Sequence, residues 1–148
     1  MGLSNSAKQG PNFVPAYQMS GTPWVKTVTS VSDTAVVITF PFVTRWIVVT
    51  INDAIGEAQA LRIGFTQNGV NANPAANANY MLLTTSATDS DKDLFVAQTP
   101  RLELRTKELV IRSDSGTIDN VSIMAGLTGI EWSQFPILSG SAGFAGVG

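Results

Sequence analysis

The chain has 148 residues, with nine lysines and arginines, eleven aspartates and glutamates, and neither histidine nor cysteine. Without histidine and cysteine there is no Ser-His-Asp or Cys-His catalysis, no Cys/His zinc centre and no disulfide. Any catalysis would have to use carboxylates, lysine or tyrosine. This length fits a single domain with an ordinary hydrophobic core.

Charge is scarce. Charged residues make up 14% of the chain, against about 25% in typical soluble domains. The net charge of −2 provides no cluster of lysine and arginine for phosphate groups, so we expect no direct binding of nucleic acid. A weakly charged surface protects a free monomer poorly against association, and it predicts a protein that functions in contact with other subunits.

We expect no membrane partner and synthesis in a cytoplasm. No apolar run reaches the length needed to span a bilayer, and the first residues lack the basic and apolar segments of a secretion signal.

Residues 1–24 are predicted to form an irregular N-terminal arm, because glycine and proline interrupt them too often for a helix or a continuous strand. Phe13, Tyr17 and Trp24 are large apolar side chains on this arm, and such side chains need a surface to lie against. That surface could belong to the same domain or to a neighbouring subunit, and the sequence leaves both open.

Residues 25–135 are predicted to form one all-β domain, an antiparallel β-sandwich of jelly-roll type. Short segments rich in β-branched and aromatic residues alternate apolar and polar side chains, and no segment of ten or more residues keeps a helical period. Residues 67–79 are predicted to be a long uncharged loop. The predicted strands cover 34–40, 44–51, 61–66, 80–84, 101–105, 108–112, 118–126 and 129–132.

Residues 136–148 are predicted to form a glycine-rich C-terminal tail. No residue from Trp132 to the end is charged, and Phe135 and Phe144 are embedded among small residues. This composition is too rich in glycine for a helix and too apolar for a well-solvated tail. Trp132, Phe135 and Phe144 therefore join Phe13, Tyr17 and Trp24 as candidate residues of an interface between subunits.

We predict no metal, no cofactor and no catalytic residues. Asp89, Asp91 and Asp93 are spaced like the start of a calcium loop, but Leu94 and Pro100 stand where an EF-hand has glycine and glutamate. A solvated turn is the preferred interpretation, and a structural cation stays open. No pair of carboxylates stands out as a glycosidase pair.

Several phrases resemble a type of small virion protein of tailed bacteriophages. They are Phe40-Pro-Phe-Val-Thr-Arg45, Ile63-Gly-Phe-Thr-Gln-Asn-Gly-Val70, Asn79-Tyr80, Ala125-Gly-Leu-Thr-Gly-Ile130 and Phe135-Pro136. The resemblance spans most of the chain from Phe13 onward. It implies a capsid cement or decoration protein, a jelly-roll-like domain that sits outside an icosahedral head, commonly as a homotrimer, and ties neighbouring subunits of the major capsid protein together. It carries over no individual site residue.

Two other classes remain open. A receptor- or glycan-binding module of a phage fibre or spike would expose Trp24 or Trp132 for stacking on sugar rings. A carboxylate-based glycan hydrolase would need two acidic residues in one cleft.

Overall fold

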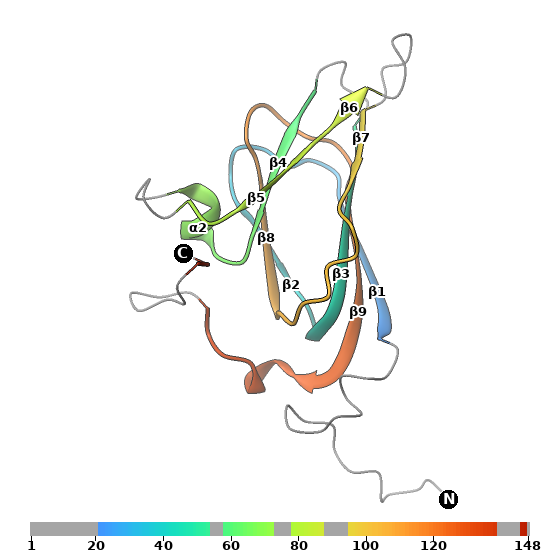
Figure 1. Ribbon diagram of the computed structural model, residues 1–148, viewed down its shortest axis with the longest axis vertical. Coiled ribbons are helices and arrows are strands. Elements are labelled where there is room, and N and C mark those ends of the chain that lie inside the picture. Colours follow the sequence, from blue (N-terminus) through green and yellow to red (C-terminus); the bar gives the residue numbers. More distant parts are fainter. Residues whose placement is uncertain (1–20, 54–57, 73–77, 88–94, 139–145, 148) are drawn as a thin grey trace, which may run out of the picture.

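The computed structural model describes residues 21–53, 58–72, 78–87, 95–138 and 146–147 (Figure 1). Strands dominate this part of the chain, with one short α-helix and one turn of 3₁₀-helix. The strands are β1 (Thr22–Val28), β2 (Val36–Thr39), β3 (Phe42–Asp53), β4 (Ala60–Gly64), β5 (Met81–Thr84), β6 (Ser86–Ala87), β7 (Phe95–Gln98), β8 (Glu108–Ser113) and β9 (Val121–Glu131). The helices are α2 (Gln67–Asn71) and η2 (Trp132–Gln134).

The strands form two antiparallel sheets packed face to face, as the sequence predicts (Figure 1). The five-stranded sheet has the order β1-β9-β3-β7-β6, and the four-stranded sheet has the order β2-β8-β4-β5. Strands pair from the outside of the sequence inward: β1 with β9, β2 with β8, β3 with β7, and β4 with β5. This nested pairing is the winding of one long antiparallel hairpin into a jelly roll, so the described strands confirm the predicted fold class.

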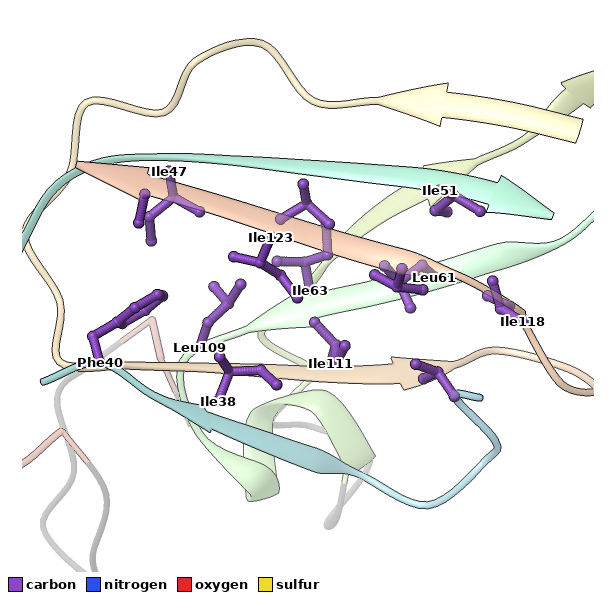
Figure 2. Packing of buried hydrophobic residues seen from close by; sticks show 14 of the residues in the cluster. Ile38, Phe40, Ile47, Ile51, Leu61, Ile63, Leu109, Ile111, Ile118 and Ile123 are labelled. Carbon is purple, nitrogen blue, oxygen red and sulfur yellow. The ribbon is translucent and has the colours of Figure 1, made fainter. Parts of the chain in front are cut away.

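The core lies between the two sheets and consists mainly of isoleucine, leucine and valine (Figure 2). Ile47, Ile51 and Ile123 project inward from the five-stranded sheet, and they meet Ile38 and Ile111 from the four-stranded sheet. Inward residues alternate with outward ones because successive side chains of a strand point to opposite faces. Val121, Ile123 and Ala125 follow this alternation along β9, and all three are fully buried.

The irregular arm was predicted to extend to residue 24, but the first strand already begins at residue 22. β1 begins at Thr22, so Trp24 lies in a strand, where its ring meets the ring of Phe40 edge-on with 4.9 Å between centroids. Pro23 is tolerated there because β1 is an edge strand, and an edge strand leaves every second N–H without a partner in the sheet. Residues 1–20 lie outside the described part of the chain.

Three further predictions were wrong in detail. Residues 101–105 form no strand, although Leu102 makes one bridge to Ile47 and the expected alternation of half-buried and exposed side chains is present. Residues 129–131 are the end of β9 and not a separate strand, and Trp132 begins η2. The predicted loop at residues 67–79 contains α2, and the Gly69 N–H of its first turn donates to the Thr66 hydroxyl.

Thr44 fixes the segment that crosses from the five-stranded sheet to β8. Its side chain is fully buried, its hydroxyl accepts from the Thr106 N–H at 3.0 Å, and the same hydroxyl lies 3.0 Å from the Leu104 carbonyl. Its own N–H donates to the Thr106 carbonyl at 2.9 Å. Thr44 therefore holds residues 104–106 beside β3.

Replacing Thr44 with valine is expected to lower the free energy of unfolding by about 1–3 kcal/mol, because a buried N–H and a buried carbonyl lose their partner. Thr27→Val is the control, since the Thr27 hydroxyl bonds to Ser122 at an exposed position and its loss leaves groups that water can reach. Urea denaturation of both variants measures the difference. Equal losses would show that Thr44 is no internal anchor.

Candidate interaction surface

The outer faces of the two sheets differ in what covers them. α2 packs on the outer side of β4 and β8, and Figure 1 shows it outside the four-stranded sheet. Val70 of α2 and Val110 of β8 are both buried. The Thr66 hydroxyl also donates to the carbonyl of Val147, so this part of the C-terminal tail lies against its own domain. The four-stranded sheet is therefore partly covered from outside.

The outer surface of the four-stranded sheet also carries charged residues, beside the exposed Leu82. Arg62 of β4 and Arg112 of β8 lie opposite each other in the strand register. The Arg62 Nε donates to Asp114 at 2.6 Å, and the guanidinium also lies 4.5 Å from the centre of the Tyr80 ring. Arg112 donates to the amide oxygen of Asn71 on α2 at 3.4 Å. This network ties α2 and the sheet together, so its charges have partners within the domain.

The five-stranded sheet has no described element on its outer side (Figure 1). Where the register is regular, up to Trp46 and Gly126, it places every second residue on this outer face, and none of these residues is charged. We call this surface the bare face; its residues are Pro23, Val25 and Thr27 of β1, Ser122, Met124 and Gly126 of β9, Trp46, Val48, Thr50 and Asn52 of β3, and Val96 and Gln98 of β7.

An apolar row crosses the middle of the bare face. Met124 lies directly opposite Val25 on one side and Val48 on the other. Val25 is 60% exposed and Met124 is 49% exposed. Exposed single apolar side chains are common on proteins, but a contiguous exposed row without charge is typical of a contact surface.

Trp46 extends this apolar surface at the end of the row. Gly126 lies opposite Trp46 in the register, and a side chain at position 126 would overlap the indole. Gly126 thus lets the indole lie flat on the sheet. Trp46 therefore packs on the outer side of the sheet.

Arginines border the bare face beside Trp46. The Arg101 guanidinium lies 5.2 Å from the centre of the Trp46 ring and pairs with Glu103 at 2.6 Å. Arg45 lies at a β-bulge, where β3 contains one more residue than the paired part of β9. Such a bulge changes the direction of a side chain. Arg45 and Arg105 line an open groove of about 500 Å³ together with Glu103 and Leu104. Positive charge therefore gathers at one border of an otherwise uncharged surface.

The structure separates the predicted interface residues. Trp24 is half-buried against the main core, and Phe135 is half-buried against the small cluster of Val43 and Ile130. Trp132 is 41% exposed. Phe13, Tyr17 and Phe144 lie outside the described residues, as do Asp89, Asp91 and Asp93.

Sequence reasoning missed the bare face and its arginine border. The available signal was the alternation in residues 44–51 and 121–126, which places Trp46, Val48 and Met124 on the face opposite the core. Nothing in the sequence indicates that this outer face, and not the other, lacks a covering helix.

Chemical sites are not evident in the described residues. They contain no group of three or more acidic residues placed to hold a metal ion, and no helix among them is long and apolar enough to cross a membrane. Comparison with protein families, curated proteins and solved structures found no match.

Proposed function

We propose that the protein is a capsid cement or decoration protein, which binds the outside of an icosahedral phage head and bridges neighbouring shell subunits. The observation that carries the proposal is the bare face, a sheet surface without charged residues and with an apolar row that is exposed at Val25 and Met124. The resemblance of the sequence to small virion proteins supplies the kind of particle. The jelly roll is compatible with this role, and by itself it is also found in lectins and enzymes.

The bare face has the composition expected of a protein contact. Contacts between proteins combine an apolar centre, depleted of charge, with a polar rim in which arginine is common. Val25, Met124 and Val48 would form the centre, and Arg45 and Arg101 would form the rim. A rigid antiparallel sheet presents these side chains without a further loss of backbone entropy on binding.

The mechanism would be mass action. A protein that binds only the assembled shell lowers the free energy of that shell relative to its dissociated subunits. A symmetric shell repeats each contact many times, so a weak contact per copy adds up over the particle. The partners would be the major capsid protein and further copies of this chain, in a homotrimer, and the protein would reside on the virion surface. No enzymatic step is required.

The test is binding of the purified full-length chain to heads of the phage that encodes it, after the heads have been stripped of this protein. We expect the chain to sediment with the heads at a fixed number of copies per shell and to raise the temperature at which the heads release their DNA. A chain that stays in the supernatant at micromolar concentration, with unchanged heads, would contradict the proposal.

A glycan-binding module is the second candidate. Such a module requires an exposed tryptophan that can stack on a sugar ring, and Trp132 is 41% exposed. One face of the indole is occupied by Lys107, whose Nζ lies 4.0 Å from the ring centre, so a sugar would have to stack on the other face.

The capsid account predicts no saturable binding on a glycan array, because Trp132 is then a surface residue beside a lysine. Trp132→Ala distinguishes the two candidates. Saturable glycan binding that this variant loses, and that a variant of the bare face such as Val25→Ala retains, would favour the glycan-binding module over the capsid protein.

A further inference from the structure

A pocket of about 160 Å³ lies where the end of the sandwich meets the start of the C-terminal tail, away from the bare face. Most of its described walls are apolar or aromatic, and two titratable side chains also reach it. The described lining residues are Phe65, Thr106, Lys107, Glu108, Trp132, Ile137 and Leu138.

Lys107 is held in this pocket by its backbone. The Lys107 carbonyl accepts from the Phe40 N–H at 2.9 Å, and the preceding residue, Thr106, is bound to Thr44. Only 6% of the Lys107 surface is exposed, which is rare for lysine. The residue as a whole is therefore packed against the domain, although its ammonium is not among the fully buried polar atoms that lack a partner.

The ammonium of Lys107 has an aromatic partner but no anionic one. Its Nζ lies 4.0 Å from the centre of the Trp132 ring. Among the described residues, no carboxylate forms an ion pair with it, since the only such pairs join Arg62 to Asp114 and Arg101 to Glu103. A ring face compensates only part of the loss of hydration of a buried cation, so the site retains an attraction for an anion.

Glu108 lines the same pocket and is the one described acidic group on its wall. No ion pair joins Glu108 to Lys107 among the described residues. The negative charge of Glu108 beside the pocket limits how much negative charge a ligand can bring.

We propose that this pocket binds a single carboxylate carried on a small apolar group. The carboxylate would pair with the Lys107 ammonium, and the apolar part would lie against Phe65, Ile137 and Leu138. A doubly charged phosphate fits worse, because one ammonium and a neighbouring carboxylate cannot balance it. The inference does not depend on the proposed capsid function.

Butyrate is the probe, titrated into the ¹⁵N-labelled full chain at constant ionic strength and followed by NMR. The chain has three tryptophans and therefore three indole N–H signals. The signal of Trp132 is assigned as the one that is absent from the spectrum of the Trp132→Phe variant. We expect butyrate to shift this signal saturably. 1-Butanol, with the same apolar group and no charge, should leave it almost unmoved.

Two substitutions separate the charge from the shape of the pocket. Lys107→Met keeps the length of the side chain and should weaken butyrate at least tenfold, because a charge-assisted contact is lost. Glu108→Gln should strengthen it a few-fold by removing the repulsion. Unchanged indole signals of Trp24 and Trp46 in each variant serve as the check on folding.

The source of the carboxylate is resolved by a second probe, N-acetylglutamate with its main-chain carboxyl amidated. Binding at least as tight as that of butyrate assigns the pocket to an acidic side chain of a protein partner, and binding of butyrate alone assigns it to a free small acid. Equal shifts with butyrate and butanol, or undiminished butyrate binding by the folded Lys107→Met variant, would overturn the proposal.

Discussion

Replacing Ile123 with alanine is expected to lower the free energy of unfolding by about 2–5 kcal/mol. Ile123 is fully buried on β9, between β1 and β3 in the five-stranded sheet, and it faces the four-stranded sheet across the core (Figure 2). Its truncation removes apolar contacts and leaves a cavity that the rigid sheets cannot close. Guanidinium or urea denaturation measures the loss as a shift of the midpoint at constant slope.

The control is the next residue in the chain. Met124→Ala lies on the opposite face of the same strand, where the side chain is 49% exposed, so we expect its effect to stay within about 0.5–1 kcal/mol. Losses of equal size at positions 123 and 124 would show that the inward and outward faces of β9 are assigned wrongly.

Met124→Glu is expected to weaken binding to phage heads by at least tenfold while leaving the fold intact. If the bare face is the contact, the new carboxylate becomes buried against an uncharged centre with no cation beside it, and an unpaired buried charge is strongly unfavourable. Affinity is measured by co-sedimentation with stripped heads over a range of protein concentrations, and folding by thermal denaturation of the free chain.

Leu82→Glu is the matched control for this variant. Leu82 is also 49% exposed, and it lies on the outer side of β5, in the four-stranded sheet. The same change of charge is thus made at the same exposure on the other sheet. The account predicts full binding by Leu82→Glu; a loss that is equal in both variants would indicate a general effect of added negative charge, and a loss in Leu82→Glu alone would place the contact on the four-stranded sheet.

Strand periodicity allowed much of the fold to be predicted. Residues 36–39, 60–64, 81–84 and 108–113 form strands close to the expected ranges, because they are rich in β-branched and other apolar residues, and residues 61–64 also alternate apolar and polar side chains. The sequence of residues 101–105 alternates equally well but forms only one bridge. Alternation therefore predicts which side chains point inward, but it does not determine whether the backbone forms the hydrogen bonds of a β-sheet.

The errors at the ends of the domain have a physical reason. Gly21 and Pro23 surround the start of β1 and predict irregular chain, yet an edge strand accepts proline. β7, at residues 95–98, was not among the predicted strands. α2 was missed because its five residues are too few to show a helical period, and its capping by Thr66 depends on one hydroxyl.

The candidate sites depended on contacts between distant residues. Trp132 was singled out as a candidate interface residue, but its neighbour Lys107 is 25 positions away in the sequence, counted from 107 to 132. Likewise, Met124 becomes part of an exposed row only because β1 and β3 flank β9 and no described element covers them. Local sequence patterns do not encode either relation.

The central claim is that the bare face of the five-stranded sheet contacts the shell or a neighbouring copy on a phage head. A cryo-electron microscopy map of the decorated head, at a resolution that separates β-sheets, tests it most directly. The account predicts jelly-roll density on the outer surface of the shell, with Val25, Met124 and Trp46 facing protein. Density in which this face points to open solvent, or a fully decorated head without the jelly roll, would contradict it.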